Sequence, residues 1–195
     1  MKIITFEGIE GVGKSTQIDL LANWLTDQNH TVEIYREPGS TKEGEMIRSI
    51  LLDPNIQLDD ISELLMMFAA RSELVNQILS SSNASYILLD RYFHASIAYQ
   101  GSGRGIPFDI INQLITIVRC PKPHLTFLLD LEVEKGFARK QSDSMDRIEL
   151  SGLDFFNKVR TGYLELSKEY SYMKVIDADQ NINQIHDEII NYINE

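Results

Sequence analysis

The sequence predicts an α/β fold in which a parallel β-sheet is flanked by helices. Short apolar runs recur along the 195 residues, and several are continuous rather than alternating, as in strands that are buried on both faces. Segments with apolar residues at helical spacing lie between these runs. Because strands alternate with helices in a chain of this length, we expect a parallel sheet, and we expect residues 1–195 to form one domain.

Five predicted strands alternate with amphipathic helices along the chain. We expect strands at residues 3–6, 31–35, 86–90, 125–131 and 173–176, and helices at residues 15–28, 61–79, 110–118, 155–170 and 182–193. Side chains that can accept a hydrogen bond from a helix N-terminus stand near several of these helix starts. The predicted N-caps are Asp59, Asp109, Ser151 and Asn181. The sequence has no internal repeat and no long linker that would indicate a second domain.

The composition is ordinary for a globular protein but is strongly acidic. The net charge is −11, from 29 acidic and 18 basic side chains. Such a field repels polyanions, so we expect no nucleic-acid polymer as a partner. No apolar run approaches the ~20 residues that span a bilayer, and the N-terminus lacks the layout of a signal peptide. The lone Cys120 cannot form an internal disulfide and is interpreted as a half-buried apolar residue. We therefore expect a cytoplasmic protein with no membrane partner.

A glycine-rich motif follows the first predicted strand. Residues 8–15 read G-I-E-G-V-G-K-S and match the pattern G-x-x-x-x-G-K-[ST], with a strand before it and a helix after it. The glycines let the backbone curl so that several N–H groups point at one anion, and the helix N-terminus adds partial positive charge. Lys14 can reach the outer phosphates, and the Ser15 hydroxyl can hold Mg²⁺. A turn without a ligand is the alternative, but the flanks favour a nucleoside triphosphate site.

Polar side chains also follow the second and third predicted strands. Arg36 comes directly after residues 31–35, and Asp90 and Arg91 end the next strand. Because ligands of parallel sheets bind beyond the carboxyl ends of the strands, we expect one cleft that joins these residues to the glycine-rich motif. Guanidinium groups suit phosphate oxygens, although each could simply face water; the candidates are Arg36, Arg48, Arg71 and Arg91. Asp90 could hold Mg²⁺ through water, or pair with Lys14 or Arg91.

Five motifs together resemble those of the thymidylate kinase family, over nearly the whole chain. They are F-E-G-I-E-G-V-G-K-S-T at residues 6–16, R-E-P-G at 36–39, D-R-Y at 90–92, A-Y-Q-G at 98–101 and D-R-I-E at 146–149. The first is shared with many nucleotide-binding proteins, whereas the others are much narrower. The resemblance implies a three-layer P-loop nucleoside monophosphate kinase-like fold, with a five-stranded parallel sheet and helices on both faces. It also implies a homodimer that phosphorylates dTMP to dTDP with ATP and Mg²⁺, in dTTP synthesis.

The resemblance implies a role for individual residues. ATP would be held by Gly8, Ile9, Glu10, Gly11, Val12, Gly13, Lys14, Ser15 and Thr16, with Ser15 and Asp90 at the Mg²⁺ ion. Lys14 and Arg91 would stabilise charge during transfer, and Glu10 would accept a hydrogen bond from the sugar 3′-OH. The dTMP site would comprise Arg36, Glu37, Arg48, Arg71, Arg91, Ser96, Tyr99 and Gln100. Within it Arg36 would grip the phosphate, Tyr99 would help to wall the sugar, and Arg71 and Gln100 would read the thymine edge.

The sequence departs from the family pattern in the predicted base pocket. Met67 stands where the family usually has an aromatic residue that stacks on thymine. Either the Met67 thioether or the neighbouring Phe68 ring would contact the base, unless both are core positions. His94 stands where bacterial relatives often carry an acid. We interpret it as a loop histidine that faces water and assign it no role in the chemistry.

A second departure concerns the lid predicted around residues 139–150. The phosphate loop carries no arginine, and family members of that kind generally supply one from the lid. Here the lid is poor in basic residues, so we expect Arg139 and Arg147 jointly to supply the catalytic arginine, with Lys140 as a further candidate. Arg147 could instead be a hinge partner of Glu149. The attacking group is already an anionic phosphate, so catalysis would rest on positioning and charge neutralisation rather than on a strong base.

Two other functions remain open from the sequence. The first is a kinase for another nucleotide on the same scaffold, since Arg71 and Gln100 do not by themselves exclude dUMP. The second is a nucleotide-binding switch that hydrolyses slowly or not at all. No switch segment is evident, whereas a second, arginine-rich acceptor site can be identified. The sequence therefore favours the kinase.

Overall fold

Five parallel strands form one sheet at the centre of the molecule. The structure is a computed structural model that describes residues 1–140 and 145–195. The strands are β1 (Lys2–Glu7), β2 (Val32–Arg36), β3 (Tyr86–Asp90), β4 (Leu125–Asp130) and β5 (Met173–Asp177). Their order is β2-β3-β1-β4-β5, and every neighbouring pair is parallel. The predicted parallel sheet is confirmed, with strand ends shifted by one residue or a few.

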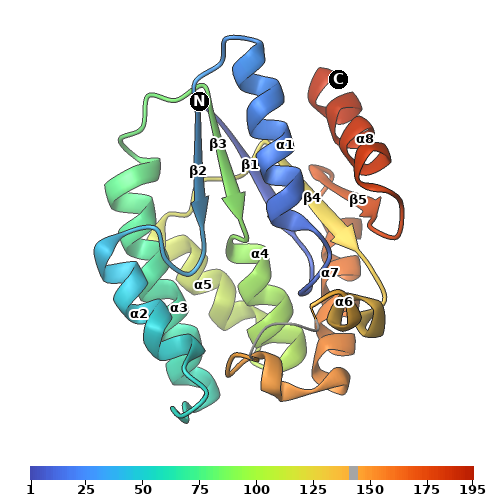
Figure 1. Cartoon of the computed structure of the whole chain (residues 1–195). Helices are drawn as coiled ribbons and strands as arrows, with labels where there is room; N and C mark the ends of the chain where they lie inside the picture. The colour runs from blue at the N-terminus through green and yellow to red at the C-terminus, as the bar shows by residue number, and fades with distance from the viewer. Residues whose placement is uncertain (141–144) are drawn as a thin grey trace.

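Helices cover both faces of the sheet (Figure 1). Helices α1 (Lys14–Asp27) and α8 (Ile182–Asn194) pack together on one face. Helix α7 (Leu153–Glu169) packs against β4 and β5 on the other. The remaining elements are α2 (Lys42–Leu52), α3 (Asp60–Leu74), α4 (Phe93–Ser96), α5 (Phe108–Val118), α6 (Val133–Arg139), the π-helices η1 (Val75–Leu79) and η2 (Ile97–Gly103), and the 3₁₀ helix η3 (Glu149–Ser151). In the described residues, none of the helices is both long and apolar enough to cross a membrane.

The core lies along the central strands, and this explains their continuous apolar runs. After its first residue β1 is buried throughout, because both neighbours and both helical layers enclose it. The Phe6 and Phe127 rings of β1 and β4 lie 5.5 Å apart between centroids. Strand order reverses at β1, since β1 leads through α1 to the edge strand β2 while β3 leads to β4 on the other side. In parallel sheets this arrangement opens a crevice at the carboxyl ends of the strands.

Two of the four predicted N-caps are confirmed. Asp59 accepts hydrogen bonds from the N-terminus of α3, and Asn181 forms a capping box on α8. Asp109 is wrong as a cap, because α5 starts earlier, behind a proline, and Asp109 falls in its first turn. Ser151 is also wrong, because it ends η3 and the glycine after it precedes α7.

The helix predicted at residues 61–79 is in fact two segments. Helix α3 ends at Leu74, and the five-residue π-helix η1 continues from it. Helical structure also extends through Gly103, the end of η2, although this stretch contains two glycines. In η2 the Gly101 and Gly103 backbones pack closely on other elements, and Phe155 would lie 2.5 Å from a Cβ at Gly103. Close packing therefore overrides the low helix propensity of glycine here.

Candidate active site

Three adjoining cavities lie along the carboxyl edge of the sheet. The first is lined by Glu10, Glu37, Pro38, Arg48, Leu52, Met67, Arg71, Arg91, Tyr92, Ala95, Ser96, Tyr99, Gln100, Asp146 and Ile148. The second is lined by Glu10, Gly11, Gly13, Lys14, Ser15, Thr16, Arg36, Glu37, Arg48, Asp90, Arg91, Arg139, Lys140, Asp146 and Glu149. The third is lined by Gly11, Val12, Gly13, Thr16, Gln17, Arg139, Ala178 and residues 180–183 and 185. The second cavity shares lining residues with the first and with the third, so the three adjoin, and together they are called the cleft. This confirms the predicted meeting of three strand ends.

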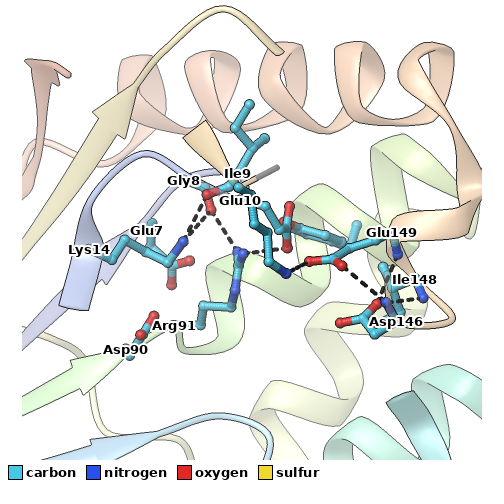
Figure 2. A network of polar contacts seen from close by, with 12 residues as sticks. Glu7, Gly8, Ile9, Glu10, Lys14, Asp90, Arg91, Asp146, Ile148 and Glu149 are labelled. Carbon is cyan, nitrogen blue, oxygen red and sulfur yellow. Dashed lines mark hydrogen bonds and ion pairs between the residues drawn. The ribbon is translucent and has the colours of Figure 1, made fainter. Parts of the chain in front are cut away.

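The glycine-rich motif forms a tight loop that leads into α1. Gly13, with φ +93°, precedes the helix, and the loop encircles the Lys14 side chain. The Lys14 ammonium donates to the carbonyl oxygens of Gly8 at 3.2 Å and Ile9 at 2.8 Å, as Figure 2 shows. Burial, and then the Arg91 charge, lower the pKa of Lys14 from 10.5 to about 8. An anion in the second cavity would relieve both effects, so the loop is electrostatically suited to phosphate.

Ser15 and Asp90, the residues predicted to hold Mg²⁺, lie beside this loop. The Ser15 hydroxyl lies 3.4 Å from Oδ2 of Asp90, and both line the second cavity. No ion pair joins Asp90 to Lys14 or Arg91 in the part of the chain that the structure describes. The same residues contain no group of three acidic, histidine or cysteine side chains that could hold a metal alone. One hydroxyl and one carboxylate fit a Mg²⁺ ion that takes its other ligands from phosphate and water.

Arg91 lies at the junction of the first and second cavities. Its guanidinium donates to the Gly8 carbonyl and to Glu10, each at 2.7 Å, and lies 4.9 Å from the centre of the Tyr99 ring. The Tyr99 hydroxyl in turn lies 3.0 Å from both Glu10 oxygens. Arg91 has a φ of +69°, a left-handed conformation that costs a non-glycine residue energy. The backbone turn therefore directs this cation back across the phosphate loop instead of along the strand.

A buried network that the sequence analysis missed supports Arg91. Glu7 is fully buried and accepts from the Tyr163 hydroxyl at 2.7 Å and the Tyr92 N–H at 2.8 Å. The Tyr163 oxygen lies 3.3 Å from Arg91, so it links Glu7 to the arginine. The available signal was a carboxylate at the end of a mostly apolar strand, immediately before Gly8.

The prediction for His94 is wrong. It is a fully buried residue of α4, not a loop histidine facing water. Its Nε2 lies 3.1 Å from the Tyr172 hydroxyl, and its Nδ1 lies 3.7 Å from Glu7. Aromatic rings of Phe93, Tyr170 and Tyr172 surround it. The imidazole thus occupies a position in the core. Its neighbours in the sequence do not indicate this burial.

Two further arginines face the second cavity. Arg36 is about half exposed and pairs with Glu45 at 2.9 Å, while Arg48 donates to the Pro38 carbonyl at 2.9 Å. Burial and then the Arg36 charge lower the pKa of Arg48. The two cations therefore repel each other, and a bound anion would stabilise them. Their positions agree with the predicted phosphate grip, while the grip itself stays a prediction.

The inner end of the first cavity is polar on one wall. The buried Arg71 guanidinium donates hydrogen bonds to the Glu37 carboxylate at 2.7 Å and to the Ser96 hydroxyl at 3.1 Å. Burial raises the pKa of Glu37, while the Arg71 charge opposes this. Glu37 is thus the ion-pair partner of Arg71. Gln100 lines the same cavity. The structure brings these predicted base-site residues together.

Met67 and Phe68 differ in their placement. Met67 lines the first cavity, whereas the Phe68 ring lies against the Arg71 guanidinium, 4.5 Å from ring centre to carbon. Both side chains are buried in the core as well. This geometry favours Met67 over Phe68 as the residue that contacts a base.

The predicted lid falls partly on residues 141–144, which lie outside the described residues. Arg139 lines the second and third cavities and donates to the Ala178 carbonyl at 2.9 Å. Arg147 points elsewhere: it pairs with Glu63 at 2.8 Å and donates to the Leu51 carbonyl at 2.7 Å. It therefore does not reach the second cavity in this structure.

Arg147 is also not the partner of Glu149. The buried Glu149 carboxylate pairs with Lys140 and accepts from the Asp146 N–H at 3.0 Å (Figure 2). Lys140 lines the second cavity. Position relative to a motif could not predict these partners, because they depend on how the segment folds back on the protein.

A glycine contact joins the phosphate loop to α6. A Cβ at Gly136 would lie 2.5 Å from the Glu10 carbonyl oxygen, and a Cβ at Gly11 would lie 2.0 Å from the Gly136 carbonyl oxygen. The two backbones are thus in direct contact, which only glycine permits. A glycine inside a helical pattern was the signal that sequence reasoning overlooked.

Comparison with known proteins gives a consistent result. A family model described as thymidylate kinase matches residues 6–189. A thymidylate kinase of Vesicomyosocius okutanii is 44% identical over 194 residues, covering 96% of this chain and 95% of its own. One of Chlorobium luteolum is 39% identical over 207 residues, covering 99% and 97%. A crystal structure of thymidylate kinase from Ehrlichia chaffeensis is similar with a TM-score of 0.81 and 32% identity, over 98% of each chain.

Proposed function

Because this chain belongs to the thymidylate kinase family, we propose that it phosphorylates dTMP to dTDP with ATP as the donor. The observation that carries the proposal is the cleft. Its first and third cavities each adjoin the second, where the phosphate loop and Arg91 are, and share no lining residue with each other. Two nucleotides with their phosphates toward the second cavity would meet head to head. A switch protein needs no such acceptor cavity.

The residues have the following roles in this proposal. The loop amides and Lys14 bind the outer phosphates of ATP, and its nucleoside occupies the third cavity. Arg36 and Arg48 hold the dTMP phosphate. The first cavity takes the sugar against Glu10 and Tyr99, and the base against Arg71 and Gln100. This assignment gives Lys14, Arg36, Arg48 and Arg71 each a phosphate or a base carbonyl as partner.

Catalysis is then a matter of alignment and charge. The attacking oxygen belongs to an anionic phosphate, so no proton has to be removed by a strong base. Arg91 is held between the two phosphate sites by Gly8 and Glu10, so it is oriented before substrate arrives. Arg139 is the better placed of the two predicted lid arginines, since it already borders the second cavity. Arg147 would act only if its segment left Glu63.

Ser15 and Asp90 would hold Mg²⁺ in this proposal. The ion supplies charge neutralisation on the phosphate oxygens. The protein would contribute only two ligands to the ion, one hydroxyl and one carboxylate. Most of the remaining positive charge comes from Lys14 and the arginines.

The test is a coupled assay of ADP release with dTMP, dUMP, dCMP and AMP as acceptors. We expect saturable turnover with the highest kcat/KM for dTMP. Faster turnover of dCMP or AMP would refute the substrate assignment. ATP hydrolysis without phosphoryl transfer to any acceptor would favour the switch.

We also propose a homodimer in the cytoplasm. Support for the dimer comes from α3 and α5, which contact each other and leave large apolar side chains exposed, among them Ile61, Leu65, Ile110 and Ile117. Light scattering after gel filtration would measure twice the 22.3 kDa chain mass. A single-chain mass at micromolar protein would contradict the dimer. The cytoplasmic location stays a prediction that fractionation would test.

A further inference from the structure

Glu63 is a buried carboxylate that contacts Gln100, a residue lining the first cavity. It is 1% exposed on α3, and it shares a helix face with Met67 and Arg71, four and eight residues further on. Nε2 of Gln100 donates to its Oε1 at 2.9 Å. Two guanidinium groups also contact the Glu63 carboxylate, Arg104 at 3.2 Å and Arg147 at 2.8 Å. Burying a carboxylate costs free energy of folding unless other groups compensate its charge.

The surroundings keep Glu63 ionised. Burial alone would raise its pKa, but the hydrogen bond from Gln100 and the charge of Arg104 outweigh burial and hold the pKa below its usual range. Arg104 is itself held in place, because it lies 4.4 Å from the centre of the Phe155 ring and 3.5 Å from Asp60. The two arginines therefore compensate the charge of Glu63.

An ionised carboxylate restricts the orientation of Gln100. It can only accept hydrogen bonds, so the end of the amide that faces Glu63 must be the NH₂ group. The other end, Oε1, is then the atom that Gln100 offers to the first cavity, which it lines. Among the described residues, no group donates a hydrogen bond to this oxygen. The cavity thus has an acceptor at Gln100 and a donor at Arg71.

We propose that Glu63 is a positioning residue that sets base selectivity, by locking Gln100 with its carbonyl toward the cavity. This inference rests on the proposed function and names the base class that the first cavity selects. Thymine and uracil present a ring N–H between two carbonyl groups, which complements a carbonyl acceptor beside a guanidinium donor. Cytosine presents a bare ring nitrogen and an amino group at the same places. The bare ring nitrogen of cytosine would then face the Gln100 carbonyl, two acceptors, and its amino group would face Arg71, two donors.

The decisive experiment compares the Glu63→Gln variant with the wild type, using dTMP and 5-methyl-dCMP as acceptors. These two substrates carry the same methyl group and differ in the hydrogen-bonding edge alone. An amide at position 63 can donate as well as accept, so Gln100 is free to turn over. We expect the kcat/KM ratio of dTMP to 5-methyl-dCMP to fall about fivefold, the factor that corresponds to one hydrogen bond of about 1 kcal/mol. The loss should appear in the KM for dTMP, with the KM for ATP unchanged.

Asp60→Asn is the matched control. It makes the same chemical change on the same helix, beside the same Arg104, but its side chain is about half exposed and does not contact Gln100. We expect its selectivity ratio to equal that of the wild type. An unchanged ratio in a folded Glu63→Gln variant would overturn the proposal, and so would an equal fall in both variants.

A measurement on the wild-type protein guards against a variant that does not fold. In a crystal of the wild-type protein with dTMP, Nε2 of Gln100 should remain on Glu63 while Oε1 meets the ring N–H. A complex in which Gln100 has left Glu63 would overturn the proposal. The proposed function fails separately, since it fails when the wild-type protein does not turn over dTMP at all.

Discussion

Lys14 gives a prediction that links the buried site to protein stability. Its pKa falls from 10.5 to about 8 in the folded protein. One pKa unit corresponds to about 1.4 kcal/mol, so keeping Lys14 protonated in the empty loop costs about 3 kcal/mol at neutral pH. Between pH values of about 8 and 10.5 the unfolded chain retains a proton that the folded chain has lost. The contribution of Lys14 to the free energy of unfolding must therefore rise with pH in this window.

The variant Lys14→Met removes this proton and isolates its effect. We expect the free energy of unfolding of the wild type, minus that of the variant, to rise by about 2 kcal/mol from about pH 7 to about pH 9.5. Urea unfolding at each pH, followed by the fluorescence of the single tryptophan, measures both proteins. Other groups titrate in both and cancel. A difference that stays flat or falls with pH would refute the argument that burial in the loop depresses this pKa. The same variant should lose phosphoryl transfer.

Three further substitutions test other parts of the cleft. Arg36→Ala should raise the KM for dTMP at least about tenfold and the KM for ATP far less; an effect on ATP alone would put Arg36 in the wrong site. Glu37→Ala leaves the buried Arg71 without its partner, so urea unfolding should show a loss of about 3–5 kcal/mol, and a loss below about 1 kcal/mol would contradict the buried pair. Gly136→Ala places a Cβ 2.5 Å from the Glu10 carbonyl oxygen, so it should cost about 1–3 kcal/mol and weaken ATP binding; unchanged thermal melting and ATP affinity would disprove that contact.

The sequence was sufficient for those parts of the site that depend on backbone order. Parallel strands end at one edge, so residues directly after strands had to meet there, and Arg36, Asp90 and Arg91 do. The glycine-rich motif carries its own geometry, since its conformation depends on local glycines and on the helix that follows. Such features are local in sequence, and patterns report them well.

The partners of buried charged groups could not be predicted in the same way. Glu63, Arg104 and Arg147 come from three separate segments, and their pairing depends on packing between α3, η2 and the chain after residue 144. The motif placed Arg147 in the lid but could not show that its guanidinium pairs with this buried carboxylate, so its catalytic role stays a prediction. His94 was misjudged for the same reason: its burial depends on the distant Tyr170 and Tyr172, which no local pattern reveals.

The anchoring of the segment between Arg139 and Arg147 has a mechanical consequence. At one end Arg139 is bonded to the Ala178 carbonyl, beside the third cavity, and at the other the Arg147 N–H is bonded to the Leu52 carbonyl, beside the first. The covalent chain between the two anchors thus connects a residue beside the third cavity to a residue beside the first. Separating the two cavities beyond the reach of this chain would require breaking one of the two hydrogen bonds.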